Sequence, residues 1–409
     1  MTTSLGAARG MDQPSRKRVF ISTGEVSGDL QGALLIEALR DRARDRHISL
    51  DITALGGPRM AKAGATLVGE TTGIGSVGIF EALPYLLPTL RIQRQAKQAL
   101  DANPPDIAVL IDYMNPNLAM GDYLKDQHPQ VPVVYYIAPQ QWVWAFSEKD
   151  TQRLVSCSDR ILAIFRAEAD YYQGFGAETT WVGHPLVDRY PGPADQAAAR
   201  QQLGISPVAP VVTLLPASRR QEVKYLMPAI LKAAQSIQAQ CPEVTFLLPV
   251  SIPALQASFE QGVVAHGLNG RVITEDSQVA IAAADVAITK SGTANLEIAL
   301  MDVPQVVAYR IHPLSARIAH YLLKFDVPYV SPVNLVVNQP VVPEFLQWQA
   351  TPEAIAAAAL TLLHDETARQ TMRSGYAKMR AELGPPGACQ RTADLILDAL
   401  AERQPVELA

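Results

Sequence analysis

Short apolar runs rich in β-branched residues recur along the chain and alternate with longer stretches in which apolar residues follow helical spacing. Such runs are typical of strands buried in a parallel sheet with helices on both faces. The predicted strands span residues 19–22, 52–55, 107–111, 131–137, 160–165 and 179–182, and later 211–215, 244–250, 271–273, 286–288 and 305–309. A regular alternation of strands and helices indicates parallel strand order, so the pattern predicts an α/β fold.

The alternation is interrupted at residues 190–193 (YPGP) and begins again at Pro210. Two doubly wound domains joined by a linker would hold a ligand in a central cleft between their strand carboxyl ends. The predicted organisation is a disordered tail at 1–17, an N-terminal Rossmann-like domain at 18–190, a linker at 191–209, and a C-terminal Rossmann-like domain with C-terminal helices at 210–409.

Composition limits the classes of function that need to be considered. Hydrophobic residues make up 48% and charged residues 18% of the 409 residues, which is ample for packed cores. A formal net charge of -5 gives no electrostatic reason to expect nucleic acid as a partner. The three cysteines are scattered and form no CxxC pair, which indicates reduced thiols in a cytoplasmic protein.

No apolar run approaches the ~20 residues that a membrane span requires. Residues 74–90 are mostly apolar but are interrupted by glycine and proline, and Arg91, Arg94 and Lys97 follow them. Exposed apolar side chains beside basic ones would suit a peripheral contact with anionic lipid. A helix packed on the core is the commoner explanation, so the pattern alone favours that alternative.

The stretch 285–297 (DVAITKSGTANLE) is the most informative in the second half of the chain. It begins as a buried strand and resumes as a helix after Ser291-Gly292-Thr293, which leaves the first helical N–H groups aimed at the carboxyl edge of the sheet. Those donors suit a phosphate, and Gly292 permits close approach of a ligand. Glu297, one turn further, could accept hydrogen bonds from both hydroxyls of a ribose. The alternative is an ordinary capped helix with a solvated glutamate.

The corresponding turn of the first half is residues 23–29 (TGEVSGD), which follows the first strand and leads into a helix. Glycines at 24, 28 and 32 recur every fourth residue and would leave one face of the helix start bare for a ligand. We therefore take Gly24, Glu25, Ser27 and Gly28 as candidate binding residues. The turn is neither a GxGxxG dinucleotide motif nor a P-loop.

Two charged side chains are candidates for chemistry. Asp112 ends an apolar strand, where a carboxylate could act as a general base or could merely cap a loop. Arg219 stands at the start of a helix that Ser218 and Gln221 would cap, and its planar guanidinium could grip phosphate oxygens. His184 also ends a strand, but a lone histidine is more often structural.

Metal and cofactor motifs are absent from the sequence. There is no HExxH, no Cys/His zinc spacing, no GxSxG and no Asp-x-Asp triplet. We therefore expect no metal site and no cofactor, and a bound diphosphate would be neutralised by basic side chains and helix N-termini.

Taken in order, the motifs resemble those of the lipid-A-disaccharide synthase family. The matching blocks run from about residue 19 to 350 and comprise 24–29 (GEVSGD), 105–112 (PDIAVLID), 142–144 (WVW), 182–184 (VGH), 215–219 (LPASR), 291–297 (SGTANLE), 306–310 (VVAYR), 334–335 (NL) and 342–347 (VPEFLQ). One block would be weak support, whereas the ordered series is strong.

The resemblance implies a GT-B glycosyltransferase that is cytoplasmic and peripheral on the inner membrane. Its donor would be UDP-2,3-diacylglucosamine and its acceptor the 6-hydroxyl of 2,3-diacylglucosamine 1-phosphate, with inversion at the donor carbon and release of UDP. By the same resemblance Asp112 would be the base, Arg219 an arginine required for activity, and Asn334 a functional asparagine. Ser291, Gly292, Thr293 and Glu297 would bind UDP.

Departures from the family pattern fall mainly in the N-terminal half. Ala217 replaces a glycine before Ser218, Ala138 replaces a serine before Pro139, and residues 76–78 (SVG) and 115–117 (NPN) also differ, the last losing a second acid. The alternatives are a divergent transferase with another lipid acceptor, a UDP-sugar epimerase, and an idle binding module. The sequence does not decide the oligomeric state, and a homodimer is kept among the predicted partners.

Overall fold

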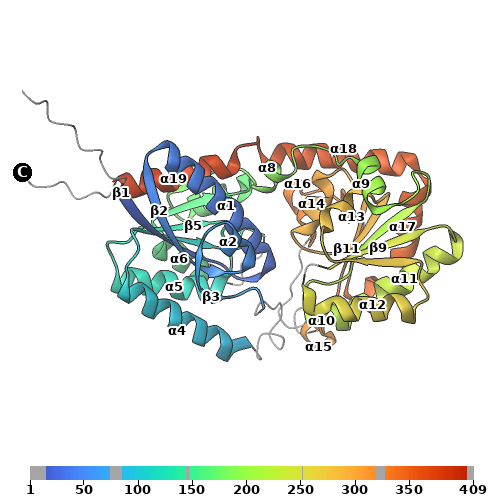
Figure 1. The fold of residues 1–409 in the computed structure, drawn as a ribbon, viewed down its shortest axis with the longest axis horizontal. Coiled ribbons are helices and arrows are strands. Elements are labelled where there is room, and N and C mark those ends of the chain that lie inside the picture. The colour runs from blue at the N-terminus through green and yellow to red at the C-terminus, as the bar shows by residue number, and fades with distance from the viewer. Residues whose placement is uncertain (1–14, 74–84, 144–146, 251, 318–327, 403–409) are drawn as a thin grey trace, which may run out of the picture.

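The computed structural model describes residues 15–73, 85–143, 147–250, 252–317 and 328–402. Two lobes stand side by side, each built on a sheet whose strands are all parallel (Figure 1). The first sheet has the strand order β3-β2-β1-β4-β5-β6-β7 and the second β10-β9-β8-β11-β12-β13. The predicted fold class, α/β with two Rossmann-like doubly wound domains, is confirmed.

Strands of both sheets are buried on two faces, as their apolar runs predicted. In the first strand Val19 and Ile21 pack in one hydrophobic cluster, whereas Phe20 between them packs in a second cluster on the opposite face. The strands are β1 (Ser15–Ser22), β2 (Ile48–Gly56), β3 (Thr66–Glu70), β4 (Ile107–Ile111), β5 (Val133–Tyr136), β6 (Arg160–Ala163), β7 (Thr179–Trp181), β8 (Val211–Leu215), β9 (Thr245–Pro249), β10 (Gly270–Ile273), β11 (Val286–Lys290), β12 (Gln305–Tyr309) and β13 (Glu344–Leu346).

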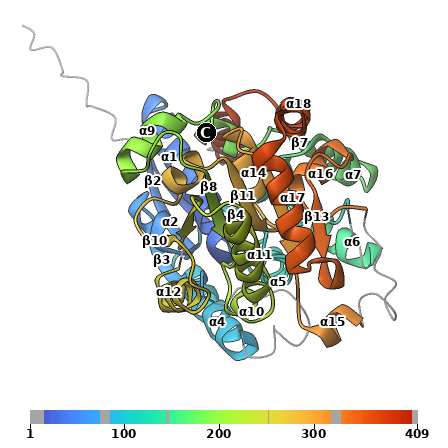
Figure 2. The ribbon, with the colours of Figure 1, turned by 90° about the vertical axis from the view of Figure 1, so that its right-hand side faces the viewer.

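Helices connect the strands and cover the sheets. In Figure 2, α11 and α17 lie together in front of the second sheet, and they make extensive contact with each other. The helices are α1 (Glu25–Asp45), α2 (Pro58–Lys62), α4 (Leu86–Ala102), α5 (Met114–Gln127), α6 (Glu148–Cys157), α7 (Arg166–Gly174), α8 (Leu186–Arg189), α9 (Gln196–Leu203), α10 (Arg220–Tyr225), α11 (Met227–Gln240), α12 (Gln256–Ala265), α13 (Ser277–Ala282), α14 (Ala294–Leu300), α15 (Pro313–Arg317), α16 (Pro332–Val337), α17 (Pro352–His364), α18 (Glu366–Leu383) and α19 (Ala388–Glu402).

The last helix corrects the predicted domain division. Helix α19 was assigned to the second domain, but it crosses back and packs on α1 of the first lobe (Figure 1). Asp394 pairs with Arg42 at 2.9 Å and with Arg46 at 2.6 Å. Asp188, after β7, accepts the backbone N–H of Cys389 at 2.8 Å and so fixes where α19 begins. The C-terminal segment therefore belongs to both lobes.

Three strand predictions also change. β1 begins at Ser15, so residues 15–17 pair with β2 instead of forming part of a tail, while 1–14 lie outside the described residues. The short edge strands β3 and β13 were not predicted, because neither carries a continuous apolar run. Both are only partly buried, which is why the hydrophobic pattern missed them.

The strand order predicts where a ligand would bind. In each sheet the order reverses between two neighbouring central strands, β1 and β4 in the first and β8 and β11 in the second. Open α/β sheets bind ligands outside the carboxyl ends of strands at such a reversal. The four segments that follow these strands are therefore where a site is expected.

Candidate active site

The segments after the four central strands carry most of the residues that the sequence singled out. Glu25 follows β1, Asp112 follows β4, Arg219 follows β8 and Ser291 follows β11. An ion pair between Arg219 and Glu25 joins the two lobes directly. The structure thus brings residues far apart in the sequence to a single interlobe site.

The turn after β4 is held in an unusual conformation. Asp112 and Tyr113 have positive φ angles of 46° and 51°, a backbone conformation that residues other than glycine rarely adopt. Asn117 Nδ2 donates to the carbonyls of Ile111 at 3.0 Å and Asp112 at 2.9 Å, and Tyr135 Oη donates to the Asp112 carbonyl at 2.8 Å. These bonds fix the backbone while the Asp112 side chain stays accessible to water. Strain maintained by its surroundings is a common property of active sites.

The surroundings of Asp112 raise its pKa to about 6. The main cause is the protein around the carboxylate, which replaces much of its hydration although water still reaches it, and the second is the negative charge of Glu25. The Tyr113 N–H and the charge of Arg219 act in the opposite direction. A carboxyl group of this pKa is ionised at neutral pH and is more basic than an ordinary aspartate, as a general base requires.

The two glycines of the first turn are explained by packing against protein. A Cβ on Gly24 would lie 2.3 Å from the Tyr113 ring, and one on Gly28 would lie 1.9 Å from Thr23 Oγ1. The bare helix face that we predicted for a ligand is therefore occupied by protein side chains. Gly24 instead lets the Tyr113 ring approach the start of α1, which couples this turn to the one carrying Asp112. Ser27 is partly exposed, so direct contact with substrate stays a prediction for it.

We expect Gly24→Ala to lower the turnover rate about 100-fold, because displacing Tyr113 would shift the Asp112 turn by roughly 1 Å. Steady-state kinetics measure the effect. Gly174→Ala is the matched control, since a Cβ there meets nothing within 4 Å. Equal rates for the two variants would show that the close approach has no bearing on catalysis.

Arg219 is held by a buried carboxylate one turn further along the chain. Glu222 is 1% exposed, its Oε1 lies 3.1 Å from Arg219 Nη1, and its Oε2 accepts the backbone N–H groups of Ser218 at 2.6 Å and Arg219 at 3.1 Å. Helix α10 starts at Arg220, so Glu222 closes the turn and Gln221 does not, contrary to the predicted capping box. Two carboxylates therefore position the guanidinium, Glu222 from the same lobe and Glu25 from the other lobe.

The turn after β11 is more fully hydrogen-bonded than its sequence suggested. Ser291 Oγ donates to the Val330 carbonyl at 2.8 Å, and the Gly292 N–H donates to Asn295 Oδ1 at 2.9 Å. Gly292 N–H is therefore not available to a ligand, which corrects the expectation that the first N–H groups are all unpaired. In the described part of the chain, the backbone N–H and hydroxyl of Thr293 have no hydrogen-bond partner.

Glu297 is oriented by Tyr190, which lies at the end of α8. Tyr190 Oη donates to Glu297 Oε2 at 2.9 Å, and burial raises the pKa of this tyrosine, as does the charge of Glu297. The other carboxylate oxygen has no hydrogen bond to the described residues. This arrangement leaves Oε1 for a ribose hydroxyl. The ribose contact itself stays a prediction.

Asn334 does not present its side chain to the site. It is fully buried, its Nδ2 donates to the Val342 carbonyl at 2.9 Å, and its Oδ1 accepts the Val342 N–H at 2.9 Å. The amide is thus used to hold two backbone segments together, which is a positioning role. The predicted direct contact with substrate gains no support from this geometry.

His184 is structural, as the sequence favoured. Burial lowers its pKa to about 3, and its Nδ1 accepts the Leu186 N–H at 3.2 Å. Asn117, Tyr190, Glu222 and Lys290 were not selected from the sequence. Glu222 could have been found from its place three residues after Arg219, where it closes the capping box. The contacts of Asn117, Tyr190 and Lys290 depend on which segments lie side by side, which the sequence does not state.

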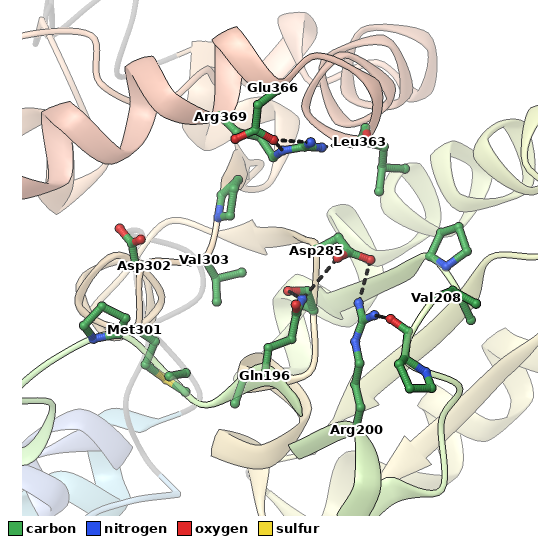
Figure 3. A pocket seen from close by; sticks show the side chains of 18 of the residues that line it. Gln196, Arg200, Val208, Asp285, Met301, Asp302, Val303, Leu363, Glu366 and Arg369 are labelled. Atoms are coloured by element: carbon green, nitrogen blue, oxygen red, sulfur yellow. Dashed lines mark hydrogen bonds and ion pairs between the residues drawn. The ribbon is translucent and has the colours of Figure 1, made fainter. Parts of the chain in front are cut away.

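A cavity of about 690 Å³ lies at the opposite edge of the second sheet, beside the amino ends of its strands. Asp285 accepts hydrogen bonds there from Arg200 at 2.8 Å and Gln196 at 3.1 Å (Figure 3). None of the candidate residues lines it. Within the described ranges, no group of three or more His, Cys, Asp or Glu side chains is placed to hold a metal ion.

Comparisons with solved structures define the architecture. The fold matches the S. aureus MnaA–UDP complex with a TM-score of 0.63 at 14% identity, covering 96% of this chain and all of that one. It matches CalG4, the calicheamicin glycosyltransferase, with a TM-score of 0.56 at 17% identity, covering 97% and 100%. Two parallel-sheet lobes with polar residues at facing strand reversals are the GT-B architecture of glycosyltransferases and UDP-sugar epimerases.

Sequence comparisons are more specific. The family described as lipid-A-disaccharide synthetase matches residues 19–398. Lipid-A-disaccharide synthases of Gloeothece citriformis and Synechocystis are 51% and 49% identical, each over 93% of this chain and over 99% and 97% of the relative. The enzyme of Geobacter metallireducens is 34% identical over 96% of this chain and its own whole length. The chain belongs to the lipid-A-disaccharide synthase family.

Proposed function

We propose that the protein joins UDP-2,3-diacylglucosamine to 2,3-diacylglucosamine 1-phosphate and forms the lipid A disaccharide and UDP. The acceptor would bind mainly to the first lobe and the donor nucleotide to the second, with Ser27 and Glu25 on the acceptor side and Thr293 and Glu297 on the donor side. Family membership supports the reaction, and the distribution of residues over the lobes supports the assignment of each substrate.

A single observation carries the proposal: Asp112 of one lobe lies close enough to Arg219 of the other, and to Glu25, to interact with both electrostatically. Glu25 is ion-paired with Arg219, and its charge contributes to the raised pKa of Asp112. A base on one lobe and a phosphate-binding cation on the other, both close to Glu25, are what sugar transfer from a nucleotide diphosphate needs.

The chemistry follows from these charges. Asp112 would take the proton of the acceptor hydroxyl as that oxygen attacks the anomeric carbon of the donor. Negative charge then develops on the departing diphosphate, where Arg219 would stabilise it. Attack from the face opposite UDP inverts the anomeric configuration, by analogy with inverting glycoside chemistry. No step of this scheme calls for a metal ion.

The purified protein can be tested by incubation with both substrates in EDTA, followed by mass spectrometry of the lipids. The expected products are the acylated disaccharide and an equal amount of UDP. Turnover with another lipid acceptor alone would indicate a divergent transferase. Conversion of the UDP-sugar without acceptor would indicate an epimerase, the activity of several proteins that share this fold.

We expect the turnover rate to rise with pH through about 6 and to level off above it, because Asp112 acts only when ionised. Glu25 raises this pKa, so Glu25→Gln should move the acidic limb of the profile to lower pH. The pH dependence of kcat under saturating substrate measures both. Glu37→Gln, on the same helix α1, is the control and should leave the limb in place. If the acidic limb of Glu25→Gln stayed at the wild-type pH, the charge of Glu25 would have no effect on the pKa of Asp112.

A surface at the start of α4 supports peripheral binding to the inner membrane. Leu86, Leu87 and Leu90 are 53%, 79% and 64% exposed, and Arg91 and Arg94 follow on the exposed side of the helix. Their exposure favours the membrane contact over the core helix, while residues 74–84 lie outside the described ranges. Among the helices described, none has the length and apolar character to cross a bilayer.

We expect Leu87→Ser with Leu90→Ser to reduce binding to vesicles that contain anionic lipid about tenfold or more, since each leucine contributes roughly 1.5–3 kcal/mol when buried. Vesicle flotation measures the change. Val208 and Val264, 89% and 81% exposed on the second lobe, provide the control pair. Equal flotation of both double variants would assign membrane contact to another surface. Sedimentation of the same proteins tests the predicted homodimer.

A further inference from the structure

Lys290 is a largely buried cation that has no role in the proposed chemistry. It ends β11, one residue beyond Thr289, which pairs with Leu215 of β8. Its side chain is only 12% exposed, and its Nζ lies 2.9 Å from the position of a Cβ on Gly292. The ammonium therefore sits directly over the turn predicted to hold the nucleotide diphosphate.

The hydrogen bonding of this ammonium is incomplete. Nζ carries three donors, but it makes one hydrogen bond to the described residues, to the Ser291 carbonyl at 3.3 Å. Its approach to Glu222 Oε1 is 3.8 Å, which is an ion pair beyond hydrogen-bond length. A buried charge with unfilled donors is costly unless a ligand completes its coordination.

Charge balance points to the nature of that ligand. Glu222 faces both Arg219 and Lys290, and Glu25 pairs with Arg219, so each cation has a carboxylate counter-ion in the free protein. Helix α14 has seven residues, and the Gly292 N–H at its start is already bonded to Asn295. The turn itself therefore supplies little positive charge to a diphosphate, and the cations must come from side chains.

We propose that Lys290 is a second diphosphate-binding cation, held beside Arg219 by the shared counter-ion Glu222 until the nucleotide supplies the acceptors that Nζ lacks. The inference deepens the proposed function and rests on it. The ligand is the diphosphate of a nucleoside diphosphate, and Lys290 would neutralise it together with Arg219 as the sugar leaves. Glu222 would act as a positioning residue for both cations, without touching the substrate.

The surroundings of Lys290 add a proton-linked signature. Burial is the main cause that lowers the pKa of Lys290, and the charge of Arg219 lowers it too, whereas Glu222, Glu25 and Glu297 raise it. A bound diphosphate adds negative charge and restores a higher pKa. UDP binding should therefore take up a proton on the alkaline side, and UDP affinity should fall as pH rises there.

The test uses the full-length protein, UDP as the probe, and titration calorimetry. Lys290→Met should weaken UDP binding about 10- to 100-fold, equal to roughly 1.4–2.8 kcal/mol. Lys290→Arg should keep most of the affinity but lose the proton uptake, measured in buffers of different ionisation enthalpy. Lys224→Met removes an exposed cation of α10 that lies over Tyr225, and should match the wild type.

The outcomes separate this inference from the proposed function. A wild-type protein that does not bind UDP would refute the function itself. A wild type that binds UDP and forms disaccharide, with unchanged affinity in Lys290→Met, would overturn only the role of Lys290. Thermal melting guards against misfolding, since replacing an under-coordinated buried charge with methionine should leave the melting temperature equal or higher. A lower melting temperature with unchanged UDP affinity would make Lys290 structural.

Discussion

Asp112→Asn should lower the rate of disaccharide formation about 10²–10⁴-fold, the range that a positioned general base contributes. Asparagine keeps the size of the side chain, and its Oδ1 can still accept the Tyr113 N–H that the carboxylate accepts in the wild type. The bonds from Asn117 and Tyr135 go to the Asp112 carbonyl, which the substitution does not change. The fold and the positive φ at this position should therefore persist. What is lost is the ability to accept a proton from the acceptor hydroxyl.

Binding measurements distinguish loss of chemistry from loss of structure. The nucleotide is assigned to the other lobe, so UDP affinity in Asp112→Asn should stay within about twofold of the wild type. Asp126→Asn, an exposed carboxylate on α5, is the control and should retain full activity. Complementation in cells tests the alternative of an idle binding module. If the protein were such a module, Asp112→Asn would support growth as well as the wild type does.

The sequence predicted the central strands because their signal is local. A run of apolar β-branched residues buried on two faces has one interpretation, and the residue after it must lie at the carboxyl edge of the sheet. Asp112 and Ser291 directly follow β4 and β11, so their position at the edge of the sheet was predicted for this reason. Arg219 was placed by its predicted helix start, which the structure confirms with Glu222 in place of Gln221. Edge strand β3 is partly exposed along its length and has no such signal.

Contacts between distant elements were the part that the sequence could not supply. Glycines 24 and 28 suggested space for a ligand, but Tyr113 and Thr23 fill that space. Lys290 was assigned no role from the sequence, because its nearness to Arg219 and Glu222 follows from the pairing of β8 with β11. Periodicity identified each helix but did not say which lobe it packs on, as α19 illustrates.

Arg219→Ala should weaken UDP binding by about 1.5–3 kcal/mol, the range for hydrogen bonds to charged groups, and should lower kcat about 10²–10³-fold. Two effects combine. The diphosphate loses a planar donor group that can bind two oxygens at once. Glu25 also loses its ion-pair partner, and Glu222 is left with Lys290 at 3.8 Å as its remaining cation among the described residues.

Two neighbouring variants separate these effects. Arg219→Lys keeps a charge near both carboxylates but lacks the planar fork, so it should recover part of the UDP affinity and little of kcat. Arg220→Ala removes the adjacent, exposed arginine and should behave as the wild type in calorimetry and in turnover. Because Arg219 is only 19% exposed and contacts both lobes, its loss should also reduce the rise in melting temperature that UDP produces. If Arg219→Ala bound UDP as the wild type does and Arg220→Ala bound it more weakly, Arg220 would be the phosphate-binding arginine, and Arg219 would have no part in the mechanism.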